Sequence, residues 1–175
     1  MLSKSIRRVD QYQMGGITVV LGFATRLANG VNALTITRGA DGKSITGLAL
    51  AAGHPVVRLE FDENEALFSD NTTIGANRFP KHQLGMKFNG RDADKNAVIE
   101  KLDLTRNTFL VRLQSGQTVL LGGVNGLIAE KSDSGAGAKL EDFNGYDVLL
   151  SGGELEKAPV VPDAEFVEFS ALVAA

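Results

Sequence analysis

The sequence has no cysteine and no tryptophan, and 4 of its 175 residues are proline. A chain without cysteine forms no disulfide, no cysteine-ligated zinc site, no iron–sulfur cluster and no thiol nucleophile. No apolar run comes near the roughly 18 residues that a membrane-spanning helix needs, so we predict no membrane segment. The start of the chain contains the pair Arg7 and Arg8, but no apolar stretch follows it. This pattern predicts no signal peptide and synthesis in the cytoplasm.

The composition is that of one globular domain. Hydrophobic residues make up 43% of the chain and charged residues 22%, and the net charge is −3. This balance argues against a general nucleic-acid-binding protein, which usually has a basic surplus. Glycine is abundant, at 20 residues, and Gly, Asn and Asp recur at short intervals, as in chains of short strands joined by tight turns. We predict a single, mainly β domain over residues 1–175, a β-sandwich or barrel with long hairpins and one short flanking helix.

Two strand patterns open the chain. The β-branched run at residues 17–23 predicts a strand. Residues 34–37 and 45–50 alternate on either side of Asp41 and Gly42, and Asp-Gly at a turn centre predicts a hairpin.

The next pattern predicts a long hairpin that pairs residues 56–68 with residues 81–88. Residues 62–65 are acidic and have two interpretations, a solvated loop or the acidic part of a long strand. We favour the long strand, because alternation continues through the acidic residues.

A helix followed directly by a hairpin is the clearest combination of elements. Residues 93–104 carry apolar side chains at spacings of three and four, which predicts a short helix packed on the sheet. Either Asp92 or Asp94 is the N-cap. Residues 108–113 and 118–122 then predict two paired strands. The second of these is apolar on both faces, which predicts a strand that is central or packed on both sides.

The remaining segments are predicted to be strands, a flexible stretch and two arms. Residues 131–139 are rich in Ser and Gly and predict a flexible segment. Residues 146–151 predict a strand. We expect residues 1–15 to be an extended arm, and residues 159–175 to be a final strand or arm in which Phe166 and Phe169 anchor the chain to a neighbouring subunit.

Residues 92–103 place oxygen-bearing side chains as a calcium-binding loop does. However, Ala97 stands where that loop needs glycine, and Asp103 stands where it needs a longer glutamate. We therefore interpret the stretch as a helix with its cap.

Other chemical motifs are incomplete. Residues 39–44 suggest a phosphate-binding loop, but Thr37 replaces the first glycine of that motif, so we interpret them as a hairpin turn. His54 and His82 are the only histidines and have no flanking ligand pattern, so we interpret both as turn residues. We predict a protein that is not an enzyme, with no catalytic residues, no metal, no cofactor and no small-molecule substrate.

From about residue 56 a series of segments follows an order known from one family. They are residues 57–61, residues 84–88, the helix, residues 108–111, residues 118–123, and residues 144–154, which end in Gly152-Gly153-Glu154 before Pro159. In this order the chain resembles tail-tube-like structural proteins of phages with Bacteroidetes-type hosts. Gly15, Gly16 and Ile17 also resemble the first strand of that family.

The resemblance implies a β-sandwich with a flanking helix that assembles into stacked rings, with long hairpins lining a channel. The implied location is the tail of the virion. The implied partners are further copies of the chain, other tail proteins and DNA in transit. An acidic channel wall would repel DNA phosphates, and the candidates for that wall are Glu60, Asp62, Glu63 and Glu65.

Two other hypotheses stay open at this point. One is a different β-structured virion protein, such as a capsid decoration, connector or adhesin-like protein. The other is a carbohydrate-binding or hydrolytic β-sandwich module. The second is disfavoured by the absence of tryptophan and the presence of only 2 tyrosines, because sugar-binding sites usually use flat aromatic side chains.

Overall fold

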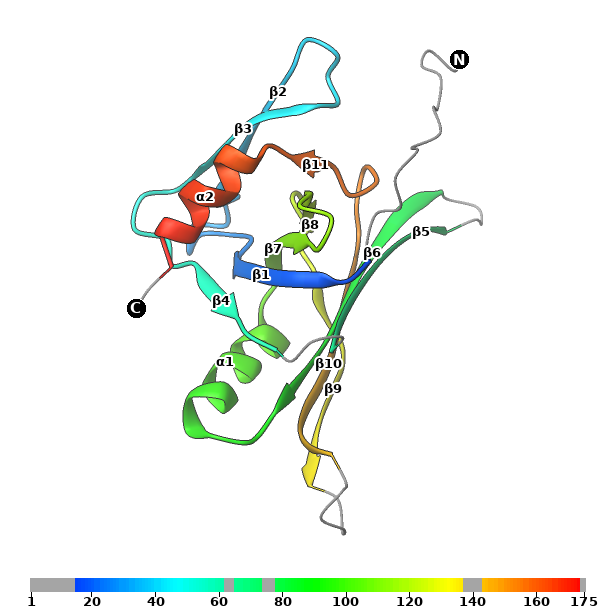
Figure 1. The fold of residues 1–175 in the computed structure, drawn as a ribbon. Helices are drawn as coiled ribbons and strands as arrows, with labels where there is room; N and C mark the ends of the chain where they lie inside the picture. The colour runs from blue at the N-terminus through cyan, green and yellow to red at the C-terminus, as the bar shows by residue number, and fades with distance from the viewer. Residues whose placement is uncertain (1–14, 62–64, 74–77, 137–142, 174–175) are drawn as a thin grey trace.

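The computed structural model describes residues 15–61, 65–73, 78–136 and 143–173. Over these residues the chain is mainly β, with several antiparallel sheets that do not close into a barrel (Figure 1). The predicted fold class is therefore confirmed, and its barrel alternative is wrong. Most of the predicted N-terminal arm, residues 1–14, lies outside the described residues.

The larger sheet has five strands in the order β11-β8-β7-β1-β4, each antiparallel to its neighbours. These strands are β1 (Ile17–Ala24), β4 (Val57–Leu59), β7 (Asn107–Leu113), β8 (Thr118–Leu121) and β11 (Val160–Val161). β7 and β8 form the predicted hairpin. β8 lies inside the sheet, between β7 and β11, as its apolar sequence predicted.

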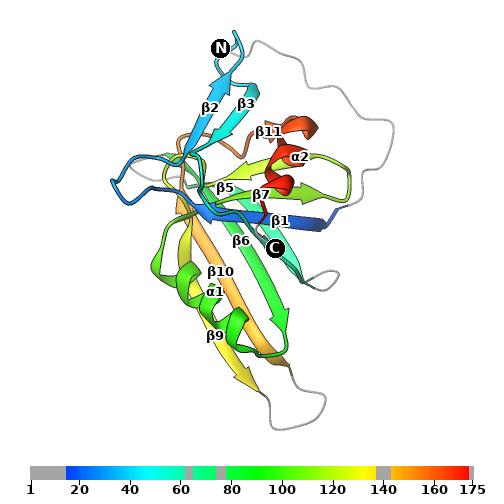
Figure 2. The same cartoon turned by 90° about the vertical axis from the view of Figure 1, so that its left-hand side faces the viewer.

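The second sheet has four strands in the order β5-β6-β10-β9, again all antiparallel. They are β5 (Ala66–Thr73), β6 (Phe79–Asn89), β9 (Ile128–Ala136) and β10 (Asn144–Gly153). In Figure 2 these long strands run steeply across β1, so that the two sheets are layered with crossed strands.

A separate hairpin projects from the body of the molecule, as the sequence predicted. It pairs β2 (Leu34–Arg38) with β3 (Ile45–Leu50). At its turn Gly42 has a φ of 65°, a left-handed conformation that glycine adopts without strain. The Asp41 carboxylate accepts hydrogen bonds from the backbone N–H groups of Lys43 at 3.0 Å and Ser44 at 2.9 Å. This stretch is therefore a hairpin turn, as interpreted.

Helix α1 (Ala93–Leu104) begins and ends as the sequence predicted. Asp92, rather than Asp94, is its N-cap, and the Asp92 carboxylate accepts a hydrogen bond from the backbone N–H of Lys95 at 2.7 Å. Ile99 and Leu102 are its buried side chains. The calcium-like spacing is thus accounted for by a capped helix.

The five-stranded sheet is buried on both faces. Phe109 and Val111 of β7 point to the face that the four-stranded sheet covers, where Leu84 and Val148 meet them. Leu110, between them in sequence, points to the opposite face, which β2, β3 and the C-terminal helix cover. Burying one such side chain contributes about 1.5–3 kcal/mol, so the fold depends on a cover for each face.

The predicted long hairpin is wrong in its first half. β4 pairs with β1, whereas β5 pairs with β6. The chain therefore passes from one sheet to the other between Leu59 and Ala66. Sequence alternation continues across this passage, because each sheet buries one face of its own strand.

The predicted flexible segment is also wrong over its described part. Residues 131–136 belong to β9 and pair with β10, Ser132 opposite Val148 and Ser134 opposite Tyr146. These small polar residues have little strand preference of their own. The long apolar strand β10 supplies the ladder that fixes them.

The predicted C-terminal strand is wrong over most of its described length, where β11 accounts for two residues and Val173 makes a single bridge to Val56. Residues after Pro162 form helix α2 (Asp163–Ala171). Phe166 and Phe169, three residues apart, fall on one side of a helix and are both buried. Asp163 and Glu165 lie in its first turn, where negative charge is favourable.

Removing the α1 cap should destabilise the protein in a pH-dependent way. The Lys95 backbone N–H holds the pKa of Asp92 below its usual value. The cap therefore stabilises fully at pH values above the ordinary carboxyl range, and this stabilisation is lost as pH falls through the lowered folded-state pKa. We expect Asp92→Ala to lower the midpoint of thermal unfolding at neutral pH. The difference in midpoint from the wild type should shrink in acid. Circular dichroism measures both midpoints.

Asp94→Ala, on the same turn, is the matched control. Equal midpoints for the two variants would contradict the assignment of the cap.

Candidate functional site

Among the residues that the structure describes, the four-stranded sheet is covered on one face, and neither of its edge strands has a partner on its outer side. Among the described residues β5 pairs only with β6, and β9 only with β10. These edge strands are long, with 8 residues in β5 and 9 in β9. The edge strands of the five-stranded sheet are short, with 3 residues in β4 and 2 in β11. An open edge presents unpaired N–H and C=O groups to which another strand can bind.

The side chains of this sheet alternate strictly between the core and the outer face. On β6, Leu84, Met86 and Phe88 are buried in the core, and Gly85 and Lys87 between them face outward. β10 repeats the pattern, with inward Tyr146, Val148 and Leu150. The outer face is consequently built from the polar half of each strand.

Ion pairs connect the strands on the outer face. Lys131 of β9 lies 2.7 Å from Asp147 of β10 and 3.1 Å from Asp133, nitrogen to oxygen. Hydrogen bonds raise the pKa of Lys131, and the bond to Asp147 has a larger effect than the bond to Asp133. At the far end of the sheet, Lys81 of β6 lies 2.9 Å from Glu130 of β9. Hydrogen bonds lower the pKa of Glu130, and the bond from Ser151 has a larger effect than the bond from Lys81.

An apolar stripe crosses the middle of the same face. Leu67 of β5, 60% exposed, lies opposite Gly85 of β6, which in turn lies opposite Leu149 of β10. A Cβ atom at Gly85 would lie 3.4 Å from Leu67 and 3.7 Å from Leu149. Both distances are ordinary van der Waals contacts, so the two leucines flank Gly85 closely and form a continuous apolar strip with it.

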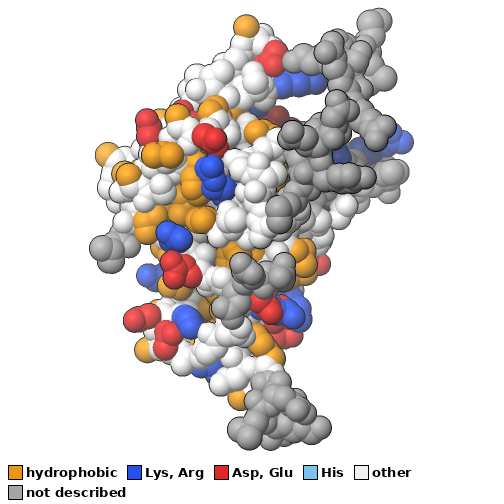
Figure 3. All heavy atoms as spheres, viewed as in Figure 1, with side chains coloured by type: hydrophobic (Ala, Val, Ile, Leu, Met, Phe, Trp, Pro, Cys, Tyr) orange, Lys and Arg blue, Asp and Glu red, His pale blue; other side chains and the backbone are white. Residues whose placement is uncertain are grey.

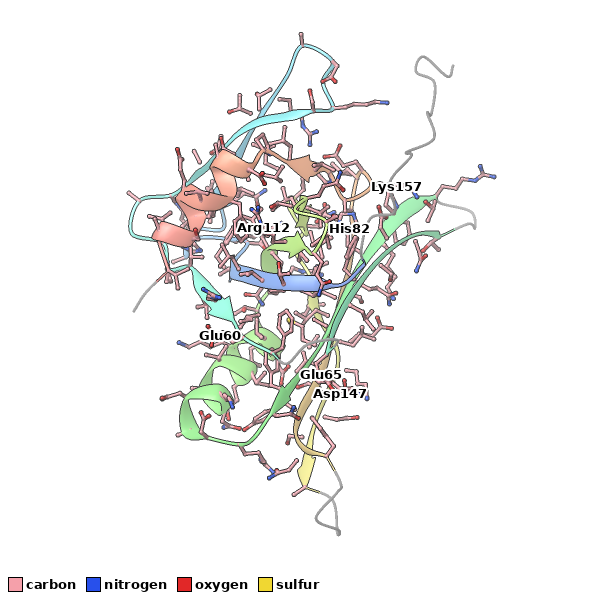
Figure 4. All side chains as sticks on the ribbon, viewed as in Figure 1. Glu60, Glu65, His82, Arg112, Asp147 and Lys157 are labelled. Carbon is pink, nitrogen blue, oxygen red and sulfur yellow. The ribbon has the colours of Figure 1, made fainter. Side chains whose placement is uncertain are left out.

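The four acidic residues predicted to form one wall are not brought together. Glu65 lies at the start of β5, where its carbonyl accepts a hydrogen bond from the Lys87 N–H at 2.9 Å, and it shares a shallow hollow with Asp147. Glu60 lies beside β4 and pairs with Arg58 at 3.4 Å. Figure 4 shows Glu60 well apart from Glu65 and Asp147. Asp62 and Glu63 lie outside the described residues.

Sequence reasoning missed the acidic residues that accompany Glu65 on this face. They are Glu130, Asp133 and Asp147. The signal that could have found them is the alternation of Lys131, Ser132, Asp133 and Ser134, in which every second residue is charged. Together with Lys81, Lys87 and Lys131, the described residues named here give four carboxylates against three ammonium groups, so this part of the face is polar and mixed in charge rather than strongly acidic.

Phe166 and Phe169 do not lie on a surface that a neighbour could reach in this conformation. They are 7% and 2% exposed and pack with Phe23, Leu48 and Leu110 in the chain's own core. Arg112 lies over the Phe166 ring, 5.0 Å from its centre. Their role in this structure is to attach α2 to the five-stranded sheet.

A buried carboxylate joins the two sheets. Glu154 follows β10 and is 4% exposed. Its Oε1 atom accepts hydrogen bonds from three consecutive backbone N–H groups of the loop after β8, those of Val124 at 3.4 Å, Asn125 at 2.9 Å and Gly126 at 3.2 Å. Consecutive N–H groups of this kind form a concave anion site, which here is filled by the protein's own side chain.

His82 makes a second connection at the same junction. It lies within β6, not in a turn as interpreted from the sequence, and is 1% exposed. Its Nδ1 accepts a hydrogen bond from the Gly122 N–H at 3.3 Å, and its Nε2 lies 2.9 Å from the carbonyl oxygen of Glu156. A carbonyl oxygen only accepts, so Nε2 is the nitrogen that donates a hydrogen bond, to the carbonyl of Glu156. His54 also has a structural partner, the Ala24 carbonyl at 2.9 Å.

The described residues contain no group of three or more histidine or acidic side chains placed to hold a metal ion. No helix in the described ranges is long and apolar enough to cross a membrane. Comparisons with protein-family profiles, with curated proteins and with solved structures find no match to this chain.

Removing the Glu154 carboxylate should be among the more damaging single changes in this chain. Glu154→Ala leaves three largely buried N–H groups without an acceptor, and we expect the free energy of unfolding to fall by about 2–4 kcal/mol. Glu154→Gln keeps an oxygen acceptor and should cost about half as much. The measurement is urea unfolding followed by circular dichroism.

The matched control is Glu168→Ala on the exposed side of α2, which should change stability by no more than about 0.5 kcal/mol. If Glu154→Ala were as mild as this control, the loop would not depend on the carboxylate.

Proposed function

We propose that this chain is a structural subunit that assembles with copies of itself through the two open edges of the four-stranded sheet. The copies form a ring, and rings stack into a tube. The assembly that we propose is the tail tube of a phage, made in the host cytoplasm and joined to other tail proteins, with DNA passing through its channel.

The observation that carries this proposal is the contrast between the edges of the two larger sheets. Proteins that stay monomeric shorten or cover their edge strands, as this chain does with β4 and β11. β5 has 8 residues and β9 has 9, against 3 in β4 and 2 in β11, and among the described residues the outer sides of β5 and β9 are unpaired. A side-by-side assembly would pair them.

Strand direction supports the same arrangement. β5 is antiparallel to β6, β6 to β10, and β10 to β9. β5 and β9 therefore run in opposite directions at the two edges. A copy placed beside the first by rotation brings its β5 against β9 in the antiparallel sense, so one continuous sheet can run around the ring.

The outer face of the sheet suits the wall of a water-filled channel. The expected acidic wall is replaced in this proposal by a wall of paired charges that includes Glu65. DNA binds proteins largely through lysine and arginine contacts to its phosphates. Lys81 and Lys131 are both engaged by carboxylates, which weakens such contacts and would let DNA pass without adhering.

Proline substitutions on β9 test the proposed pairing. Successive residues of a strand direct their N–H groups to opposite sides, so of Ser132 and Asp133 one has its N–H toward β10 and the other toward the open edge. We expect one of the variants Ser132→Pro and Asp133→Pro to keep the thermal midpoint but lose assembly, and the other to lower the midpoint. Light scattering and negative-stain microscopy report assembly, and circular dichroism reports folding.

Rings or tubes of the wild-type protein, lost in the proline variant that still folds, support the proposal. A wild-type protein that stays monomeric at high concentration contradicts it, and binding of that monomer to glycans would favour a carbohydrate-binding module. Assembly that survives both proline variants would contradict the role of β9.

A further inference from the structure

A groove runs between the edge strand β4 and helix α1. It consists of two hollows of about 270 and 250 Å³, which share Val57, Leu59 and Val98 in their lining. Val57 is 39% exposed. Figure 3 shows hydrophobic side chains on this face of the molecule, with charged side chains of both signs among them. Exposed apolar surface with a polar rim is typical of a contact surface for another protein.

The end of the groove at the start of α1 has one carboxylate in excess. Four charged residues line the first hollow, namely Arg58, Glu60, Asp94 and Lys95. Arg58 lies 3.4 Å from Glu60, and Lys95 lies 3.5 Å from Asp92, nitrogen to oxygen. Among the described residues Asp94 has no ion-pair partner. Its carboxylate is therefore the unpaired charge at this end.

The other end of the groove has the opposite charge. Lys101 is the one charged residue in the lining of the second hollow, and no carboxylate in the described part of the chain pairs with it. Lys101 follows Asp94 by seven residues, or about two helical turns, which is roughly 10 Å along α1. One turn beyond Lys101, the side chain of Leu104 is 82% exposed.

We propose that this groove is the contact surface of a two-fold dimer of the chain. A two-fold axis sets a surface against its own copy, so that every contact occurs twice. With the axis at the middle of the groove, near Val57 and Val98, the two α1 helices run antiparallel. Lys101 of each copy then meets Asp94 of the other.

The distribution of charge favours a second copy over a partner with one sign of charge. A basic partner would leave its own charge against Lys101, and an acidic partner would leave its charge against Asp94, and such like-charge contacts are unfavourable. An inverted copy of the same surface matches both ends. Antiparallel helices also bring the positive end of one helix dipole near the negative end of the other.

This inference goes beyond the proposed function and does not depend on it. The dimer uses α1 and β4, whereas the proposed ring uses β5 and β9. Copies that all point the same way along a tube are related by rotation and translation along its axis, and no two-fold axis joins them. The dimer is therefore a state of the protein before it assembles.

Charge reversal in the full-length chain tests the dimer. Asp94→Lys and Lys101→Glu each set like charges against each other at both ends of the contact. We expect each variant alone to dimerise at least about tenfold more weakly than the wild type. In an equal mixture of the two variants each end joins opposite charges, so a heterodimer should form with at least the affinity of the wild-type dimer.

Sedimentation velocity measures the dimer, native mass spectrometry identifies the heterodimer by its mass, and circular dichroism reports folding. Glu100→Lys is the matched control, because Glu100 is an exposed residue of α1 that does not line the groove. This variant should dimerise as the wild type does.

Variants that dimerise as strongly as the wild type would overturn the inference. A mixture that fails to restore the dimer would overturn it as well, since the loss would then come from the fold and not from the contact. Wild-type rings without a dimer, and without a heterodimer in the mixture, would overturn this inference and leave the proposed function standing. Wild-type dimers that are restored in the mixture but never form larger assemblies would support it and contradict the proposed function.

Discussion

The rest of the structure depends on the burial of the β7–β8 hairpin on both faces. Val119 and Leu121 of β8 pack with one cluster, and Leu120 between them packs with the other. A strand of this kind needs a layer on each side. The four-stranded sheet supplies one layer, and the β2–β3 hairpin with α2 supplies the other (Figure 1). Each of these layers directs apolar side chains of one face into the core.

The position of the β7–β8 hairpin explains why the edge strands of the five-stranded sheet are short and those of the four-stranded sheet are long. The five-stranded sheet is enclosed between layers, so its edge strands need only be long enough to complete the core. The four-stranded sheet forms an outer layer, and its strands extend as far as β6 and β10 can bury apolar side chains beneath them. Edge strands paired along most of that length are then also long and open. Their capacity for further pairing follows from the layering rather than from any special sequence in β5 or β9.

Local patterns predicted the elements whose partners are close in sequence. Helix α1 and the β2–β3 and β7–β8 hairpins are of this kind, because a cap, a turn glycine and a few alternating side chains determine each. Three segments depend on distant partners and were predicted wrongly: residues 56–68, residues 131–136 and the residues after Pro162. Residues 131–136 become a strand through β10. The spacing of Phe166 and Phe169 was compatible with either a strand anchor or a helix, and burial against Leu110 and Phe23 decides for the helix.

The candidate site was the least predictable part for the same reason. Glu60 and Glu65 are five residues apart in sequence, yet they lie beside strands of different sheets, because Glu60 follows β4 and Glu65 precedes β5. Asp147 is far from Glu65 in sequence but lines the same hollow, since β6 lies between their strands and pairs with both. The hydrophobic periodicity of a sequence does not indicate which strands become neighbours in this way.

The polar contacts of Glu154 and His82 matter because they fix how the two sheets meet. Apolar layers can slide against each other at little cost, because dispersion contacts are individually weak and not directional. A carboxylate held by three N–H groups and a buried imidazole with two backbone partners have one good geometry each. Both bind loops or strand ends of the five-stranded sheet to the four-stranded one. In the proposed ring the angle between the sheets sets how each subunit presents β5 and β9 to its neighbours. A junction that resists sliding would then hold the curvature of the ring the same from copy to copy.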